Sequence, residues 1–469
     1  MMGTITFSLE NSKEGISALE AGVSQLVSKL PFLGGNVVWT IDPDSGKGVG
    51  EVHPPTAATW STYPMLCVRH HGGKYTPVSY ERPTGPGRCN TVSYDDIFRE
   101  EFLPMPLDTV LAETHPVLRF QANVLEDGII LCASVHHNAI DGRGIYTVME
   151  ALAACCRNPT NVQQNELAID PISEAVCRKR LSAAASPAPD AFVVLRGENC
   201  PIPAAPDRGP QAPITRLLVL SGERVIQLRS MCNALVRDEA RGDAESSEVE
   251  NPKLALSSHD IISALMWLCV LRSRARSDPQ FPRQGKSHFA FATDVRTLMS
   301  EDLWTTYIGN CVIPATIESP FSIQDAVKSA SATISSPGQF DLSLIARLAL
   351  AVRSGFRSVG KTQVTDVISS IGSRNEEMLS ACAADFGISS MRHTGFYKLK
   401  FGPVLGRVAH ADIPDPRMQN QAWVLPDRYV GHYARSPWEI RIALEPMVME
   451  YLLEDRLFGW MQGTELCKL

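Results

Sequence analysis

Two histidines and one aspartate, closely spaced, are the residues of this sequence best suited to chemistry. The apolar run Ile129–Val135 leads into His136 and His137, and Asp141-Gly142 follows. Together they form the pattern H-H-x-x-x-D-G. A neutral imidazole with a pKa of about 7 can take a proton from a hydroxyl or amine that attacks an acyl donor. We therefore predict that His137 is a general base and that Asp141 supports its loop.

Less specific interpretations of this pattern stay open. A second pair, His70-His71, is followed by Gly-Gly-Lys-Tyr and has no aspartate, which shows that paired histidines by themselves mean little. The stretch around His137 could therefore be a surface turn. A zinc site is disfavoured, because no third ligand follows at a suitable spacing. We predict no metal site.

The stretch Gly355–Thr362 reads GFRSVGKT and matches the phosphate-loop pattern G-x-x-x-x-G-K-[ST]. A true phosphate loop lies between a buried strand and a helix. The residues before Gly355 have helical spacing instead, and no apolar strand that ends in aspartate lies nearby. We interpret this stretch as a basic turn between helices, with contact to a phosphorylated cofactor left open.

Composition excludes several classes of protein. The chain has 469 residues, enough for two domains, and its hydrophobic and charged fractions of 44% and 20% are typical of a soluble globular protein. A net charge of −7 argues against nucleic-acid binding, although local basic groups can still bind an anion. The twelve cysteines include no C-x-x-C pair, which favours reduced thiols. Without a secretory signal or an apolar run of roughly 20 residues, we expect a cytoplasmic protein that does not bind membranes.

Strands and helices alternate along the first half. Apolar periodicity predicts strands at residues 4–9, 36–41, 65–69, 117–124 and 129–135, and helices at 16–30, 95–102 and from 145 onward. The last two strands flank Asp127-Gly128, which is a hairpin signal. Residues 42–62 are rich in Pro, Gly, Ser and Thr and are expected to form a loop.

A proline-rich stretch separates the first half from the second. We interpret residues 171–213 as a semi-extended crossover between an N-terminal domain, 1–170, and a C-terminal domain, 214–469. The second half has predicted strands at 215–220, 289–295, 422–425 and 438–444, predicted helices at 222–237, 259–274, 323–335, 342–353 and 447–458, and an exposed loop at 238–253. Interleaved strands and helices predict an α/β or α+β fold with mixed sheets.

Several stretches, in this order, resemble motifs of the BAHD acyltransferase family, and especially its fungal, trichothecene O-acetyltransferase-like branch. They are LVSKLPFLGGNVV, the H-H-x-x-x-D-G pattern, SSHDIISALMW, TDVRTLM with YIGN, KFGPVLGRV and WEIRIALEPMVMEYLLEDRLF. The resemblance covers nearly the whole chain. It implies two chloramphenicol-acetyltransferase-like domains with the active site at their interface. It also implies a monomer that uses acyl-CoA, here acetyl-CoA, and a small hydroxylated metabolite, with no tightly bound cofactor.

The resemblance also implies roles for individual residues. His137 would be the general base, acting in a ternary complex without an acyl-enzyme. Asp141 would point away from the substrate and pair with Arg296, which is structural. Gly142 would permit the tight turn. Ser389 and Ser390 lie where the family has a Thr or Ser near the acceptor.

One motif departs from the family pattern. The stretch KFGPVLGRV stands where the family has D-F-G-W-G, so Lys400 replaces the acid, whereas Phe401 and Gly402 are kept and would shape the cofactor side. A lysine cannot accept the hydrogen bonds that a carboxylate accepts. Two alternatives therefore stay open: a condensation-type domain that takes its acyl group from a carrier protein, and a catalytically degenerate binding protein.

Overall fold

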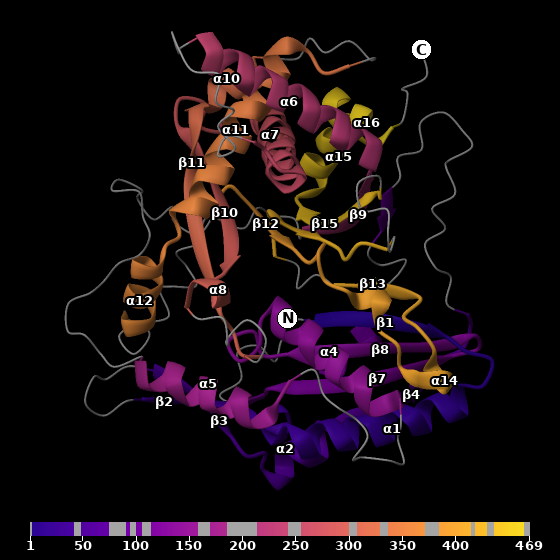
Figure 1. The fold of residues 1–469 in the computed structure, drawn as a ribbon. Coiled ribbons are helices and arrows are strands. Elements are labelled where there is room, and N and C mark those ends of the chain that lie inside the picture. Colours follow the sequence, from indigo (N-terminus) through magenta and orange to yellow (C-terminus); the bar gives the residue numbers. More distant parts are fainter. Residues whose placement is uncertain are drawn as a thin grey trace.

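The molecule has two lobes, each built around a large sheet with helices packed against it (Figure 1). The structure is a computed structural model that describes residues 2–41, 48–74, 91–93, 100–105, 114–157, 169–184, 213–242, 255–299, 307–328, 336–370, 384–413, 418–428 and 436–463. None of the helices in these ranges is long and apolar enough to cross a lipid bilayer.

The lower sheet in Figure 1 is built mainly from the first half of the chain. Its strands, in spatial order, are β13 (His410–Asp412), β1 (Met2–Ser8), β8 (Gly128–Val135), β7 (Leu118–Leu125) and β4 (Leu66–His70). The predicted hairpin is confirmed, since β7 and β8 pair antiparallel and are buried along their whole length. The helices α1 (Ser12–Lys29) and α4 (Gly142–Arg157) pack against this sheet and each other through apolar side chains at helical spacing. A smaller sheet contains β3 (Gly48–His53), β2 (Asn36–Ile41) and β6 (Thr114–Pro116).

The upper sheet is mixed and has seven strands. In spatial order they are β11 (Val312–Ser322), β10 (Lys286–Asp294), β12 (Phe386–Ser390), β14 (Gln421–Val424), β15 (Trp438–Leu444), β9 (Ile214–Leu220) and β5 (Thr91–Ser93). The pairs β10–β12 and β12–β14 are parallel, and the other pairs are antiparallel. The carboxyl ends of β10, β12 and β14 therefore lie at one edge of the sheet.

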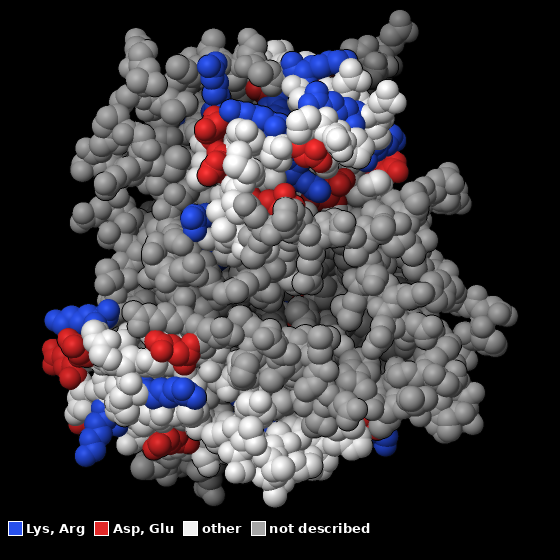
Figure 2. Space-filling model, turned by 180° about the vertical axis from the view of Figure 1, so that it is seen from behind, with Lys and Arg blue, Asp and Glu red and all other residues white. Residues whose placement is uncertain are grey.

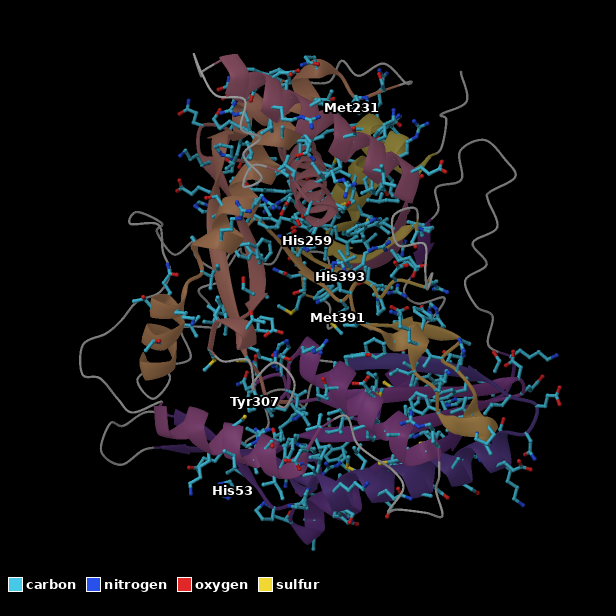
Figure 3. All side chains as sticks on the ribbon, viewed as in Figure 1. His53, Met231, His259, Tyr307, Met391 and His393 are labelled. Carbon is cyan, nitrogen blue, oxygen red and sulfur yellow. The ribbon has the colours of Figure 1, made fainter. Side chains whose placement is uncertain are left out.

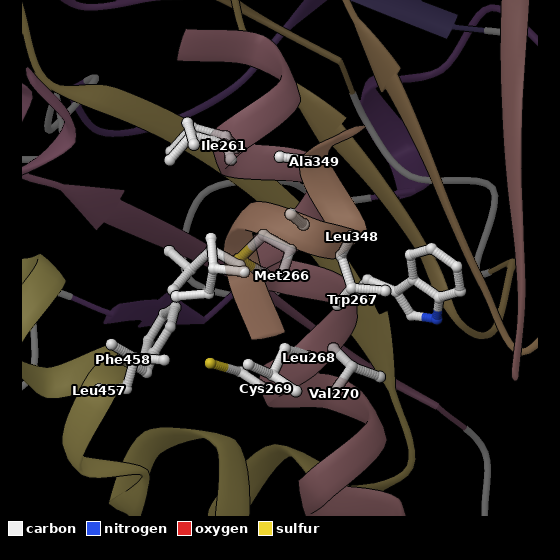
Figure 4. Packing of buried hydrophobic residues seen from close by; sticks show 14 of the residues in the cluster. Ile261, Met266, Trp267, Leu268, Cys269, Val270, Leu348, Ala349, Leu457 and Phe458 are labelled. Carbon is white, nitrogen blue, oxygen red and sulfur yellow. The ribbon is translucent and has the colours of Figure 1, made fainter. Parts of the chain in front are cut away.

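The helix α7 (Ser258–Ser277) forms the centre of the upper lobe. Ser257 and Asp260 close its N-terminus with a capping box, each side chain accepting from the backbone of the other. Its flanking helices are α6 (Gly222–Gly242), α11 (Gln339–Ser358), α15 (Pro446–Glu454) and α16 (Arg456–Gln462). Figure 4 shows Trp267 beside Leu348 of α11 and Phe458 of α16 near the same helix. Because partners surround it, α7 is apolar on nearly every side.

The two halves of the chain exchange short strands. The strand β5 from the first half joins β9 in the upper sheet, and β13 from the second half joins β1 in the lower sheet. Phe401 is also fully buried in the lower lobe, where its ring lies edge-on to Phe7 at 4.8 Å. The division at residues 170 and 213 stays a prediction, but neither sheet is built from one side of it alone.

The loop expected at residues 42–62 is wrong in part. The structure contains β3 and the helix α2 (Ala57–Thr62) within this range, and residues 42–47 lie outside the described part. The strand β3 has the sequence GVGEVH. Its two glycines have no side chain, so the alternation of apolar and polar side chains that would indicate a strand is not visible in the sequence. Thr56 caps α2 by accepting from the backbone N–H of Thr59.

The crossover is also only partly as expected. Its first part is the helix α5 (Pro171–Ala184), whereas residues 185–212 lie outside the described ranges. Pro171 opens this helix at a position where a missing N–H does no harm. Asp170 accepts from the backbone of Ile172 and Ser173, so a sequence signal for this helix was present.

Three helix predictions differ in their limits. The helix expected at 447–458 is two helices, α15 and α16, because Asp455 ends the first and caps the second through the backbone N–H of Phe458. The helix expected at 323–335 is α10 (Ile323–Val327), and residues 329–335 lie outside the described part. Of the expected helix at 95–102, residues 95–99 are not described and Glu100–Phe102 form one 3₁₀ turn. The loop expected at 238–253 begins later, since α6 continues to Gly242.

The stretch that carries Lys400 folds tightly in spite of its altered motif. Lys400 is exposed and forms an isolated bridge with Arg407, so the position does not need a buried carboxylate. The backbone N–H of Phe401 donates to the carbonyl of Gly406 at 2.8 Å. Between them α14 (Gly402–Leu405) begins at Gly402, whose φ is +94°. A Cβ at this glycine would lie 2.9 Å from the Cα of Arg157.

We therefore predict that Gly402→Ala lowers the free energy of unfolding by about 2–4 kcal/mol, since it combines a positive φ with a backbone collision. Gly406→Ala is the matched control, because Gly406 also has a positive φ, +71°, but open space around its Cα. This variant should lose only about 1 kcal/mol. Urea unfolding followed by tryptophan fluorescence measures both, and equal losses would contradict the argument from close approach.

Candidate active site

His137 lies where the two lobes meet, in the turn between β8 and α4. The backbone N–H of His136 donates to the carbonyl of Val117 at 2.9 Å, which extends the sheet up to the turn. The carbonyl of His136 then accepts from the N–H groups of Ala139 and Ile140. From the upper lobe, the side-chain amide of Asn310 donates to the carbonyl of His137 at 2.9 Å. The backbone on both sides of His137 is therefore fixed, while its side chain is exposed.

The environment keeps the His137 imidazole neutral at pH 7. Burial of part of the ring lowers its pKa, and a hydrogen bond to its own backbone carbonyl together with the charge of Asp141 opposes this effect without reversing it. A ring nitrogen that bonds to a carbonyl carries the proton, which leaves the lone pair of the other nitrogen available. A residue in this state can accept a proton from a substrate.

Asp141 and Arg296 form a fully buried ion pair between the lobes. Both side chains have no exposed area, and an Nη atom of Arg296 lies 2.9 Å and 3.0 Å from the two carboxylate oxygens. The carboxylate also accepts from the backbone N–H groups of Gly144 and Cys311, both at 2.8 Å. Asp141 therefore points into the protein, and the pair expected from the family resemblance is present in the structure.

Arg296, at the start of α8 (Arg296–Met299), connects further segments. Its guanidinium donates to Asp294 at 2.9 Å and to the carbonyls of Tyr307 and Gly309 at 3.1 Å and 2.6 Å. Figure 3 shows Tyr307 at the level of the lower lobe. Burial raises the pKa of Tyr307 to about 12, so its hydroxyl stays protonated. Arg296 thus fixes the loop that brings Asn310 to His137.

Two glycines let the lobes come close at the histidine loop. A Cβ at Gly142 would lie 2.8 Å from the Sδ of Met391, and one at Gly144 would lie 2.0 Å from the carbonyl oxygen of Ile308. Gly142 is not among the glycines with positive φ. Gly142 therefore leaves room for Met391 of the opposite lobe and does not adopt an unusual turn conformation. Sequence reasoning missed Gly144, Met391 and Ile308, because only the fold brings them together.

The structure brings one of the two predicted serines to a cavity near this contact. Ser390, the exposed last residue of β12, lines a cavity of about 370 Å³ and precedes Met391. Ser389 is half-buried and lies opposite Trp423 in the pairing of β12 with β14. Figure 3 shows His259, His393 and Met391 following one another from the upper lobe toward the lower one.

Phe401 and Gly402 are not brought to His137. Gly402 packs against Arg157, the last residue of α4, whereas the histidine loop precedes the first residue of that helix. At a rise of 1.5 Å per residue, the two ends of α4 are roughly 20 Å apart. These two residues therefore anchor the exchanged segment in the lower lobe.

His136 packs against a histidine that the sequence did not single out. The rings of His136 and His115 are 5.2 Å apart and edge to face. Burial lowers the pKa of His136 to about 4 and also lowers that of His115, so both are neutral at pH 7. The Nδ1 of His136 has no hydrogen-bond partner within the described ranges. No group of three or more His, Cys, Asp or Glu side chains in those ranges could hold a metal ion.

Two family models match the chain. The model of the Transferase family matches residues 90–456, and that of the Trichothecene 3-O-acetyltransferase-like N-terminal domain matches residues 4–156. Among similar curated proteins, the fumigaclavine B O-acetyltransferase of Aspergillus fumigatus is 29% identical over 95% of this chain and 91% of its own length. The communesin N16 acyltransferase of Penicillium expansum is 26% identical over 97% and 93%.

Solved structures resemble the whole fold. TRI101 of F. sporotrichioides, complexed with coenzyme A and T-2, superposes with a TM-score of 0.67 at 17% identity, over 98% of this chain and 94% of that one. Vinorine synthase superposes with a TM-score of 0.56 at 14% identity, over 97% and 90%. At these identities the likeness concerns the fold alone, and it confirms the predicted two-domain class with mixed sheets.

The buried pair yields a stability prediction. Asp141→Asn should lower the free energy of unfolding by about 3 kcal/mol, because Arg296 stays buried without its main counter-charge. Asp294→Asn is the matched control: it removes another carboxylate bound to Arg296, but its side chain is 27% exposed. We expect this control to lose less than about 1 kcal/mol. Chemical denaturation of both variants is the measurement, and a control as unstable as Asp141→Asn would contradict the assignment.

Proposed function

The chain belongs to the Transferase family, and from this premise we propose that it moves an acetyl group from acetyl-CoA to a hydroxyl group of a small secondary metabolite. The enzyme is an acyl-CoA-dependent O-acyltransferase, in line with its curated relatives, several of which are O-acetyltransferases of fungi. The choice of acetyl-CoA rests on these relatives and on the coenzyme A bound in the TRI101 structures.

The observation that carries the proposal is the state of His137. Its imidazole is neutral, exposed between the lobes and held by a backbone that both lobes fix. An exposed base with a rigid support is the group that a direct transfer from thioester to hydroxyl requires. Asp141 cannot share this task, because its oxygens are occupied inside the protein.

The proposed reaction has two steps. His137 takes the proton of the acceptor hydroxyl while the oxygen attacks the thioester carbonyl, which gives a tetrahedral oxyanion. The C–S bond then breaks, the acetyl ester is released, and the imidazolium returns its proton to the thiolate of coenzyme A. Both substrates are bound together, and no acyl-enzyme forms. Each hydrogen bond to the oxyanion could lower the barrier by roughly 3 kcal/mol.

We predict that His137→Ala lowers kcat/KM by about 10²–10⁴-fold while the protein stays folded, because it removes only the general base. Release of free coenzyme A thiol and mass spectrometry of products, with acetyl-CoA and a panel of hydroxylated alkaloids and terpenoids plus amine analogues, measure the transfer. His70→Ala is the control, since His70 is an exposed histidine of β4. Turnover of His137→Ala close to that of the unchanged protein would refute the role of His137.

The pH profile should show the lowered pKa of His137. The neutral imidazole is the active form, so kcat/KM should be flat at neutral pH and fall as the pH drops through this pKa. Because burial lowers the pKa below its usual value of 6.5, the acidic limb should have its midpoint below pH 6.5. An acidic midpoint above pH 7 would show that another group controls the reaction.

A further inference from the structure

The side-chain amide of Asn310 forms a direct hydrogen bond from the upper lobe to the backbone of His137. Its Nδ2 donates to the carbonyl oxygen of His137 at 2.9 Å. The side chain is half-buried, and it belongs neither to the wall of the cavity at Ser390 nor to the buried ion pair. The reaction proposed above gives this amide no task.

Two partners fix the orientation of this amide. While Nδ2 of Asn310 donates to His137, its Oδ1 accepts from the backbone N–H of Val312 at 3.1 Å. A side-chain amide has donors on its nitrogen and acceptors on its oxygen. If the amide were turned over, two donors would meet at Val312 and two acceptors would meet at His137. Asn310 therefore presents its nitrogen to His137.

The buried ion pair holds the backbone on both sides of Asn310. The carbonyl of Gly309 accepts from Arg296 at 2.6 Å. The backbone N–H of Cys311 donates to Asp141 at 2.8 Å. Because both neighbours in the chain are bonded to the pair, the position of the amide follows from the way in which the lobes dock. Asn310 is thus a donor at a fixed place.

The carbonyl oxygen of His137 also accepts from the imidazole of the same residue. Only Nδ1 can form this bond, because Nε2 lies on the far side of the ring. Nδ1 then carries the proton, and Nε2 keeps the lone pair that can take a proton from an acceptor hydroxyl. The amide of Asn310 and the Nδ1–H group therefore meet at one oxygen atom, which has one lone pair for each.

Hydrogen bonds close to the ring, rather than distant charges, select between its two neutral forms. The Nδ1–H and Nε2–H tautomers have the same net charge, so a distant charge favours neither form strongly. Figure 2 shows Lys and Arg side chains interspersed with Asp and Glu on the described part of the rear face. A fixed carbonyl oxygen next to Nδ1 is a local feature that favours one tautomer.

We propose that Asn310 is a positioning residue for the His137 imidazole. By holding the carbonyl oxygen of His137 in place, it keeps the proton on Nδ1 and directs Nε2 toward the acceptor hydroxyl. Asn310 itself takes no proton. The proposal rests on the proposed function, since it assigns a residue that supports the same base. Without the amide, the carbonyl can rotate, the ring turns with it, and both tautomers become populated.

Steady-state kinetics of Asn310→Ala test this role at about pH 8, where the imidazole is neutral because its pKa is lowered. We expect kcat to fall about 10- to 100-fold, since a displaced base loses much of its efficiency, and both KM values to stay within about twofold. Asn310→Asp keeps the acceptor for Val312 and removes only the donor, so its kcat should fall at least as far.

Asn233→Ala is the matched control. Asn233, on α6, also links two backbone segments, because it donates to the carbonyl of Leu256 at 3.2 Å and accepts from its N–H at 2.8 Å. It lies within the upper lobe and does not contact the histidine loop. This variant should unfold at a lower urea concentration than the original protein, while its kcat stays the same.

Nitrogen-15 NMR of protein with labelled histidine reads the tautomer directly and needs no substrate. Comparison with His137→Ala identifies the signals of His137. In the original protein we expect a protonated Nδ1 and an unprotonated Nε2. In Asn310→Ala the two signals should move toward a common average, because both tautomers exchange. In Asn233→Ala they should stay where they are.

Three results would overturn the positioning role while the proposed function stands. The first is a kcat of Asn310→Ala equal to that of the original protein. The second is a lowered kcat with an unchanged tautomer of His137. The third is a raised KM with an unchanged kcat, which would show that Asn310 binds a substrate. If instead the original protein transfers no acetyl group, or His137→Ala turns over normally, the proposed function fails and the positioning role fails with it.

Discussion

The buried pair of Asp141 and Arg296 is the constraint on which the site depends. Two charges removed from water are costly unless each is fully hydrogen-bonded, and here each is. One charge comes from each half of the chain, so the pair forms only when the lobes are docked in one register. The same docking brings Asn310 to the carbonyl of His137. The position of the His137 backbone is therefore a consequence of how the lobes meet, and Asp141 supports it from inside the protein.

The exchanged segment secures the same docking at a second place. Asp412 on β13 of the lower sheet forms a buried ion pair with Arg441 on β15 of the upper sheet, with Nε at 2.9 Å from a carboxylate oxygen. Burial alone would raise the pKa of Asp412. The nearby Arg441 and His410 outweigh this effect and hold the pKa well below its usual value. Phe401 holds the preceding loop in the lower core. This arrangement accounts for the tolerance of Lys400, since a buried aromatic ring, not the residue beside it, anchors the loop.

Features of the fold that depend on local sequence patterns could be predicted from the sequence. Features that depend on contacts between distant segments could not. The hairpin before His137 and the mixed α/β class follow from periodicity and turn chemistry. The pairing of Asp141 with Arg296 was reached only through family resemblance, because nothing local connects them. Strands of three residues, such as β5 and β13, are too short to show a period. The need for glycine at position 144 has no sequence signal, because it arises from the carbonyl oxygen of Ile308 in the opposite lobe, which leaves no room for a Cβ.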